Sequence, residues 1–432
     1  MERKIVKKIV AWKNSSRRKP LIISGARQVG KTYTALTFGK EHYKNTAYFN
    51  MEDSRELQAI FERDLKPERI IRELSALSGQ SIFPKDTLII FDEIQSCERA
   101  LTSLKYFCEN APEYHIIATG SLLGVAMNRE KYSFPVGKVD MLTMYPLDFE
   151  EFLTANDNKA LLALIKESFE NFSPLSLHDM ALDLYKVYLV VGGMPQAVLE
   201  YINTKDFNFV LAAQKAINDA YIADMAKYAT PQETTKIMAA WASIPAQLSK
   251  ENRKFQYKVI KSGARAYEYA TPLDWLKFAG IINKCVRITE GKLPLTAYTD
   301  NDSFKVYMMD TGLLCSKFGI SANAVLNGIP GFDGFKGVLA ENYICQCLIV
   351  NGFTPFYWGS SGKAELDFVF QDSQGNIIPL EGKSADNVKS KSLRQFVSLY
   401  KPKYAVRVSA KNFGYENNIK SIPLYALFCL VP

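Results

Sequence analysis

The sequence has few features that would place it in a membrane, outside the cell or among zinc-binding proteins. No apolar run approaches the about 18 residues that a transmembrane helix needs, and Lys4, Lys7 and Lys8 interrupt what would be a signal-peptide core. The seven cysteines include a single close pair, Cys345 and Cys347, and the three histidines lie far from it. This spacing excludes zinc-finger motifs and favours reduced thiols. We therefore expect a soluble, cytoplasmic protein that makes no membrane contact.

The charge balance is basic without being extreme. The 53 lysines and arginines outnumber 45 acidic residues, for a formal net charge of +8. This excess permits binding to a polyanion but does not establish it, so the location of the basic residues matters more than their number. The 432 residues leave room for about three domains.

A glycine-rich loop near the N-terminus carries the clearest chemical signal. It follows the apolar run 21–23 and precedes a stretch, 33–40, that we expect to be helical. Backbone N–H groups of such a loop surround phosphate oxygens, Lys31 reaches the β- and γ-phosphates, and the Thr32 hydroxyl ligates Mg²⁺. The strand before the loop and the helix after it favour a nucleoside triphosphate site over a chance turn. The loop residues have the pattern Gly-x-x-x-x-Gly-Lys-Thr: Gly25, Ala26, Arg27, Gln28, Val29, Gly30, Lys31 and Thr32.

Short apolar segments alternate with helix-like ones over the first part of the chain. This alternation is typical of a parallel sheet covered by helices, which predicts an α/β fold. Apolar residues at near-helical spacing also predict an amphipathic helix within residues 1–13. The expected strands are 21–24, 46–50, 87–91, 114–118 and 139–143.

Two acidic residues follow the third of these strands. Asp92 and Glu93 stand at the carboxyl end of a buried strand, where ligands bind in open α/β sheets. Asp92 would hold Mg²⁺, directly or through water, and Glu93 would polarise the attacking water. The alternative is a simple helix N-cap.

Thr119 and Ser121 follow the next strand. These hydroxyls would sense the γ-phosphate or position the water, or else cap the following helix. If this strand lies between the loop strand and the Asp-Glu strand, they come close to both, but the sequence does not show the strand order.

Basic residues gather in the middle of the chain. Helical stretches run from about residue 206 to 248, and the segment 250–266 then contains one acid. Strand-like runs follow at 286–288 and 304–309, and helices followed by a two-stranded wing fit a winged helix. Such a unit contacts nucleic-acid phosphates without reading the sequence; the alternative is a solvated packing module. The basic residues are Lys250, Arg253, Lys254, Lys258, Lys261 and Arg265.

The C-terminal part combines a helix with a charged hairpin. After a glycine-rich linker, 328–337, we expect a helix over 336–350 that contains Glu341, and strands at 365–370 and 377–383. A loop of residues 373–375 would place Asp367 opposite Glu381, with Lys383 on the same face. Two carboxylates that hold Mg²⁺ or Mn²⁺ and a lysine that orients water suit a metal-dependent phosphodiesterase. The alternative is a charged surface hairpin, and the basic tail with Lys389, Lys391 and Arg394 either follows a phosphate backbone or is solvated.

Together these motifs resemble the AAA-type ATPases of bacteria and archaea that carry a C-terminal domain of unknown function. The resemblance covers nearly the whole chain. It implies an AAA-like core that uses ATP and Mg²⁺, a winged-helix middle segment and a nuclease-like C-terminal domain. The Asp367, Glu381 and Lys383 pattern is similar to that of the PD-(D/E)xK nucleases, and Glu341 matches the acid on their first helix. The motifs that carry the resemblance are residues 25–32, 91–95, 118–121, 145–152 and 192–195.

The chain departs from this family at one position. Gly137 and Lys138 stand where relatives often carry an arginine, and a lysine lacks the planar bidentate contact of an arginine finger. Arg129 is the nearest alternative, or else a plain surface arginine. AAA-type relatives often assemble so that one subunit completes its neighbour's site, so a homo-oligomer stays open.

The sequence thus predicts three regions with coupled activities. Residues 1–205 are expected to form the ATPase with its helical extension, 206–327 the winged-helix-like domain, and 328–432 the nuclease-like domain. We expect Mg²⁺-dependent ATP hydrolysis coupled to DNA binding, with DNA cleavage by the C-terminal domain. The alternative is a nucleotide-controlled switch that binds DNA or protein and never cuts. A component of a toxin or defence system is a third reading that the sequence does not decide.

Overall fold

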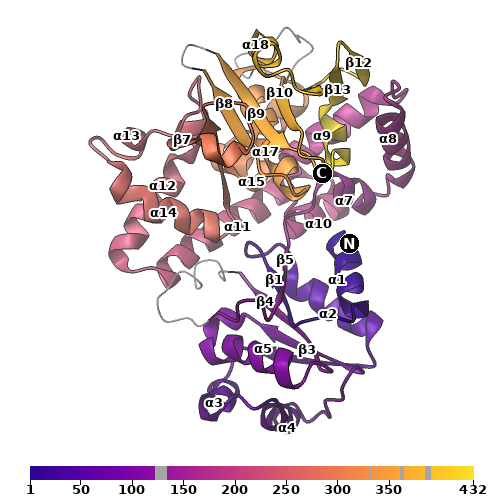
Figure 1. Ribbon diagram of the computed structural model, residues 1–432, viewed down its shortest axis with the longest axis vertical. Coiled ribbons are helices and arrows are strands. Elements are labelled where there is room, and N and C mark those ends of the chain that lie inside the picture. Colours follow the sequence, from indigo (N-terminus) through magenta and orange to yellow (C-terminus); the bar gives the residue numbers. More distant parts are fainter. Residues whose placement is uncertain (122–133, 330–332, 361–363, 385–390) are drawn as a thin grey trace. The chain divides into compact units, whose positions relative to one another are not determined.

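The computed structural model describes residues 1–121, 134–329, 333–360, 364–384 and 391–432 (Figure 1). The chain divides into two units by its internal contacts. Unit 1 comprises Met1–Tyr145 with Phe278–Gly280, and unit 2 comprises Pro146–Lys277 with Ile281–Pro432. Within the described ranges, no helix is long and apolar enough to cross a membrane.

Unit 1 is built on a parallel sheet. Its strand order is β2-β3-β4-β1-β5, and every neighbouring pair is parallel. The predicted α/β class and all five predicted strands are confirmed. The order also answers what the sequence left open, because β4 lies between β1 and β3. The strands are β1 (Leu21–Ser24), β2 (Asn45–Asn50), β3 (Thr87–Asp92), β4 (His115–Gly120) and β5 (Asp140–Thr143).

Helices cover both faces of this sheet. On one face, buried residues such as Phe49, Phe61 and Phe91 form the core. On the other face α2 packs closely, because a Cβ on Gly39 would collide with Thr46. The predicted N-terminal helix is confirmed as α1, which buries Ile9. The helices are α1 (Ile5–Asn14), α2 (Lys31–His42), α3 (Arg55–Arg63), α4 (Pro67–Ser78), the short η1 (Ile94–Ser96) and α5 (Glu98–Asn110).

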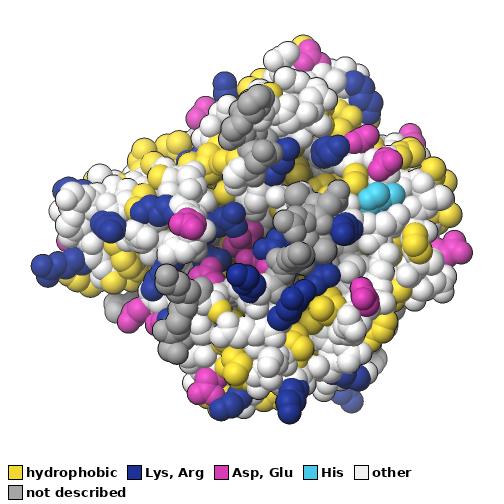
Figure 2. All heavy atoms as spheres, turned by 90° about the horizontal axis from the view of Figure 1, so that it is seen from above, with side chains coloured by type: hydrophobic (Ala, Val, Ile, Leu, Met, Phe, Trp, Pro, Cys, Tyr) yellow, Lys and Arg dark blue, Asp and Glu magenta, His cyan; other side chains and the backbone are white. Residues whose placement is uncertain are grey.

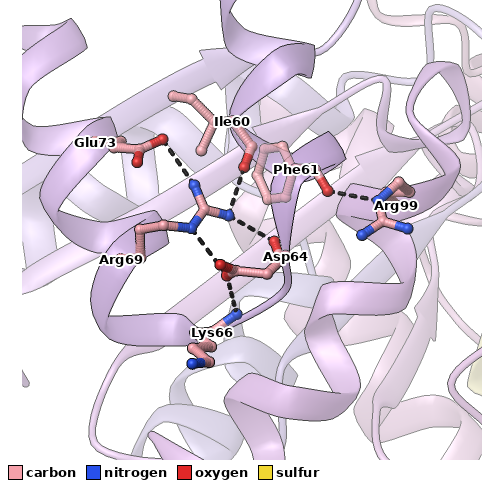
Figure 3. A network of polar contacts seen from close by, with 7 residues as sticks. All are labelled: Ile60, Phe61, Asp64, Lys66, Arg69, Glu73 and Arg99. Carbon is pink, nitrogen blue, oxygen red and sulfur yellow. Dashed lines mark hydrogen bonds and ion pairs between the residues drawn. The ribbon is translucent and has the colours of Figure 1, made fainter.

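One buried arginine ties α3 to α4 (Figure 3). Arg69 of α4 donates through Nε to Asp64 Oδ1 at 2.9 Å and through Nη1 to Glu73 Oε2 at 2.7 Å. Its Nη2 donates to the backbone oxygens of Ile60 at 2.8 Å and Asp64 at 2.6 Å, at the end of α3. The guanidinium thereby satisfies carbonyl groups that the end of a helix leaves without partners.

Unit 2 begins with helices. The glycine pair 192–193 lies in a short turn that joins α9 to α10. Gly193 N donates to Asp310 Oδ2 at 2.6 Å, and the same carboxylate accepts from Leu313 N at 2.8 Å through Oδ1. The helices are α7 (Phe149–Ala155), α8 (Lys159–Asn171), α9 (His178–Val191), α10 (Pro195–Thr204), α11 (Phe207–Tyr228), α12 (Pro231–Leu248), α13 (Tyr257–Ile260), α14 (Ala266–Phe278), α15 (Thr311–Phe318) and α16 (Ala322–Leu326).

The rest of unit 2 contains an eight-stranded mixed sheet with the order β12-β13-β11-β10-β9-β8-β6-β7. Its core beside α18 includes Trp358, Leu366 and Phe396. The remaining elements are β6 (Ile282–Ile288), η2 (Leu295–Tyr298), β7 (Thr299–Met308), α17 (Asp333–Val350), β8 (Phe356–Gly359), β9 (Glu365–Gln371), β10 (Ile377–Gly382), α18 (Lys391–Tyr400), β11 (Ala405–Ser409), β12 (Gly414–Glu416), β13 (Ile419–Pro423) and η3 (Leu424–Cys429).

The two strands expected to form a wing belong to this sheet. β6 and β7 pair with each other as an antiparallel hairpin, but β6 also pairs in parallel with β8, through Val286 opposite Phe356. One sheet therefore contains strands from both sides of the domain boundary that the sequence predicts at residues 327 and 328. The winged-helix assignment is not confirmed.

Candidate functional site

The glycine-rich loop of unit 1 adopts a conformation that its glycines make accessible. Gly25 has a φ of 143°, and a Cβ there would collide with the backbone oxygen of Met144. Gly30, with a φ of 96°, precedes α2. Lys31 Nζ donates to the backbone oxygens of Gly25 at 3.0 Å and Ala26 at 2.8 Å, so the loop curls around the ammonium group. The N-terminus of α2 is thus placed as an anion site would require.

Asp92 accepts hydrogen bonds from several elements at once. Thr32 Oγ1, in the first turn of α2, lies 3.0 Å from both carboxylate oxygens. Tyr48 OH donates to Oδ2 at 2.8 Å, Thr119 donates to Oδ1, and the backbone N–H of Glu93 also donates to Oδ1. A hydroxyl and a carboxylate side by side offer the oxygen ligands that Mg²⁺ prefers. The residues present therefore fit a Mg²⁺ ion at Thr32 and Asp92.

Glu93 lies beside this carboxylate in an uncommon backbone conformation. Its φ of 49° lies in the left-handed region, which residues other than glycine seldom adopt. Gln95 Nε2 donates to Glu93 Oε2 at 2.5 Å, and Ser121 Oγ donates to the same oxygen at 3.3 Å. The two donors fix the side chain of the residue that the sequence proposes as a base.

The central position of β4 explains how Thr119 and Ser121 reach the two acids. Because β4 lies beside β3, Thr119 reaches Asp92 and Ser121 reaches Glu93. The alternative role, capping the next helix, falls on residues 122–133, which lie outside the described residues. The structure therefore brings together Lys31, Thr32, Asp92, Glu93, Thr119 and Ser121.

Sequence reasoning missed two residues of this site, Tyr48 and Gln95. Tyr48 lies on β2, two residues before Asn50, which pairs with Asp92. The alternation along β2 puts Tyr48 and Asn50 on one face, but the sequence gives no sign that β2 and β3 are neighbours. Burial, the hydrogen bond to Asp92 and the nearby negative charges raise the pKa of the Tyr48 hydroxyl well above its usual value.

The lysine at the position expected to carry an arginine finger forms an ion pair within unit 1. Lys138 Nζ forms an ion pair with Glu109 Oε1 of α5 at 2.9 Å. The sequence alternative, Arg129, lies outside the described residues.

The charged hairpin of unit 2 has the register that the sequence predicts. Leu380 pairs with Phe368 in the antiparallel ladder of β9 and β10, and the next pair in this register is Glu381 with Asp367. Gly382 N donates to Asp367 Oδ2 at 2.9 Å. Lys383 Nζ lies 2.7 Å from Glu381 Oε1, so the lysine shares the face of the carboxylate as predicted.

Glu341 has cationic partners instead of joining these two carboxylates. The side chain is buried on α17 and forms ion pairs with Arg253 and with Lys305 at 3.1 Å, and Tyr307 OH donates to it. Lys305 also pairs with Glu365 at 2.7 Å. In the described parts of the chain, no group of three or more His, Cys, Asp or Glu residues is arranged to hold a metal ion. The expected metal ligands Asp367, Glu381 and Glu341 are therefore not assembled as one such group.

The basic residues of the segment 250–266 are partly buried or exposed. Arg253 is used in the ion pair with Glu341, and Lys250 donates to Gln256. Lys258, Lys261 and Arg265 are exposed. In the basic tail Lys391 and Arg394 are exposed, whereas Lys389 lies outside the described residues.

Three models of known protein families match separate parts of the chain. Residues 17–153 match a family model described as "AAA domain". Residues 182–324 match one described as "Domain of unknown function (DUF8612)", and residues 336–427 match "Domain of unknown function (DUF4143)". No curated protein matches the sequence significantly.

Solved structures with partial similarity include three nucleotide-dependent or DNA-associated proteins. The Walker-type ATPase PABY2304 of Pyrococcus abyssi has a TM-score of 0.45 at 15% identity, over 73% of this chain and 95% of that one. For the Aeropyrum pernix ORC1 protein in complex with DNA the TM-score is 0.31 at 12% identity, over 75% and 90%. For the Thermotoga maritima RuvB Holliday junction branch migration motor it is 0.32 at 14%, over 66% and 89%. The match to an AAA domain lies over the parallel sheet and glycine-rich loop of unit 1 and extends a few residues beyond that unit.

Proposed function

We propose that unit 1 binds ATP with Mg²⁺ and hydrolyses its terminal phosphate bond. The observation that carries this proposal is the approach of Thr32 Oγ1 to within 3.0 Å of Asp92, with Glu93 held beside them by Gln95 and Ser121. A metal-binding pair next to an oriented carboxylate is what hydrolysis requires beyond nucleotide binding.

Each residue then has a role set by its place. Backbone N–H groups of the loop 25–32 and the ammonium of Lys31 bind the β- and γ-phosphates. Thr32 and Asp92 hold Mg²⁺, which when bound neutralises charge developing on the phosphate oxygens. Glu93 accepts a proton from the attacking water, while Thr119 and Ser121 fix the two acids.

Turnover should be slow for the chain acting alone. An arginine finger contributes about 10³ to 10⁵ in rate in the enzymes that have one, and Lys138 is paired with Glu109. We propose that an arginine from a second copy of this chain, or the binding of DNA, raises the rate.

Replacing Glu93 by glutamine tests the assignment of the base. Glu93→Gln keeps the shape of the side chain but removes its capacity to accept a proton, so ATP turnover should fall at least about 100-fold while ATP affinity is retained. Steady-state phosphate release and equilibrium binding of ATP measure the two quantities. Glu62→Gln, at an exposed position of α3, is the matched control and should leave both unchanged. Full turnover by Glu93→Gln would remove Glu93 from this role.

A second proposal concerns DNA. Lys258, Lys261 and Arg265 are exposed within one short segment of unit 2, and in this proposal residues 206–327 act as a winged-helix-like module that contacts DNA phosphates. On the face drawn in Figure 2, lysine and arginine side chains are spread over the surface with acidic side chains between them. Such contacts predict binding that weakens steeply with salt.

DNA cleavage is proposed for the hairpin of the C-terminal region, residues 328–432. The support is the register of β9 and β10, which extended by one pair beyond Leu380 and Phe368 sets Glu381 opposite Asp367, and the place of Lys383, 2.7 Å from Glu381. The alternative, a switch that binds DNA or protein without cutting, is favoured by the cationic partners of Glu341, because Arg253 and Lys305 already neutralise the carboxylate that would bind a metal.

Incubation of the protein with DNA distinguishes the nuclease from the switch that does not cut. Supercoiled, linear and single-stranded DNA are incubated with the full chain and either Mg²⁺ or Mn²⁺, with Lys383→Ala as control. Cleavage that is lost in Lys383→Ala supports the nuclease. DNA binding without cleavage under every condition supports the switch. Measuring ATP turnover with and without the same DNA shows whether the two units are coupled.

A further inference from the structure

Tyr48 donates to Asp92 from outside the phosphate loop and the two central strands of the site. It lies on β2, one of the two edge strands of the sheet in unit 1. Ala47 and Phe49 point into the core, so the alternation along β2 turns Tyr48 to the opposite face, which Asp92 shares. From there its hydroxyl donates to Asp92 Oδ2 at 2.8 Å.

The hydroxyl of Tyr48 and two of the other donors bind different oxygens of the Asp92 carboxylate. Thr119 and the backbone N–H of Glu93 both bind Oδ1, whereas Tyr48 binds Oδ2. Thr32 stands 3.0 Å from both oxygens and is itself an expected ligand of the metal. If Thr32 served as a ligand of Mg²⁺, Tyr48 would still hold Oδ2 and with it the plane of the carboxylate.

Packing of the ring does not account for this placement. Tyr48 is 39% exposed, at the edge of the sheet, and its neighbours along β2 supply the core residues. The feature that distinguishes the position is the hydroxyl and its carboxylate partner. Groups that orient a metal-binding carboxylate commonly change metal affinity by about 10- to 100-fold when removed.

We propose that Tyr48 is a positioning residue of the ATPase site, which holds the Asp92 carboxylate in the orientation that binds Mg²⁺. The inference rests on the proposed function of unit 1 and deepens it, because it assigns control of the metal to a residue outside the phosphate loop and the Asp-Glu strand.

The test measures metal binding separately from catalysis. Tyr48→Phe removes only the hydroxyl and keeps the ring. The full chain is saturated with a non-hydrolysable ATP analogue and titrated with Mn²⁺, and the dissociation constant of Mn²⁺ is compared with that of the unsubstituted protein. We expect a rise of about tenfold, and a similar rise in the Mg²⁺ concentration that gives half-maximal ATP turnover. Tyr106→Phe, on α5 of the same unit, should leave both values unchanged.

Two further measurements distinguish a positioning role of Tyr48 from a purely structural one. A purely structural role would lower the unfolding temperature of Tyr48→Phe without changing its Mn²⁺ affinity, and this outcome would overturn the proposal. In a double-mutant cycle, Tyr48→Phe should have no further effect on Mn²⁺ affinity once Asp92→Asn is present, because Tyr48 acts through that carboxylate; additive effects would also overturn it. Absence of ATP turnover by the unsubstituted protein, with Mn²⁺ binding that depends on Tyr48, would instead refute hydrolysis and leave the positioning role standing.

Discussion

At the residue scale, Arg69 shows how much of unit 1 depends on one side chain. Its guanidinium is largely buried and makes four hydrogen bonds, two to carboxylates and two to backbone oxygens at the end of α3 (Figure 3). The carboxylates of Asp64 and Glu73 are about one-third exposed and can be rehydrated. The bond to the Ile60 oxygen is buried, so the cost of losing Arg69 falls mainly on that carbonyl group.

We predict that Arg69→Met destabilises unit 1 by about 2 to 3 kcal/mol. Methionine fills much of the same volume but donates no hydrogen bond. Denaturant unfolding, monitored by a probe in unit 1, measures the change in free energy. Arg72→Met, at an exposed position of the same helix, is the control and should change it by less than about 0.5 kcal/mol. Equal stabilities for the two variants would show that the network contributes nothing.

Some residues of the site can be predicted from the sequence and others cannot. Lys31, Thr32, Asp92 and Glu93 could be predicted because each lies in a short pattern with a known physical purpose. Tyr48 could not be, because its partner is distant in sequence and nothing local signals the contact. Glu341 was expected beside two carboxylates, whereas the structure pairs it with basic side chains from residues 253 and 305.

At the element scale, the turn between α9 and α10 depends on a carboxylate from the start of α15. Asp310 is fully buried, and its two oxygens accept from Gly193 N and Leu313 N. The approach is close enough that a Cβ on Gly192 would collide with the carboxylate. Burial raises the pKa of Asp310 to about 6, although the backbone N–H groups partly oppose the shift.

Asp310→Ala should therefore destabilise unit 2 by about 2 to 3 kcal/mol, because it leaves two buried N–H groups without acceptors. Asp206→Ala is the matched control: it removes another aspartate N-cap, from the exposed start of α11, and should cost about 1 kcal/mol. Denaturant unfolding of unit 2 compares the two. A cost for Asp310→Ala no larger than that of the control would contradict the link between α15 and the turn.

The raised pKa of Asp310 also determines how the stability of unit 2 changes with pH. Because the folded-state pKa of Asp310 lies above the unfolded value of about 3.9, its contribution to stability is full below pH 4 and declines as the pH rises through about 6. The destabilisation caused by Asp310→Ala should thus be larger at pH 5 than at pH 7.5. An equal or smaller loss at pH 5 would show that burial does not penalise the ionised carboxyl.

Single strands and the register of one hairpin could be predicted from the sequence, whereas the pairing of strands far apart in the chain could not. The five strands of unit 1 and the register of β9 with β10 follow from local alternation and loop length. The insertion of β4 between β1 and β3, and the pairing of β6 with β8, join segments far apart in the chain. The expected two-stranded wing is not confirmed, because a hairpin alone does not show which further strand it pairs with.

At the scale of the whole molecule, the two units carry different chemistry. Unit 1 contains a glycine-rich loop, a hydroxyl beside a carboxylate and an oriented acid, whereas unit 2 contains buried ion pairs and a charged hairpin. The domain division at 205 and 327, the contact with DNA and the cleavage of DNA stay predictions.

The most direct test is single-turnover hydrolysis of ATP bound to the full chain. We predict that the unsubstituted protein converts bound ATP to ADP when Mg²⁺ is present and retains ATP when the metal is chelated. Glu93→Gln should bind the same amount of ATP and retain it in either condition. Conversion by Glu93→Gln at the rate of the unsubstituted protein, or no conversion by the unsubstituted protein with Mg²⁺, would contradict the central claim.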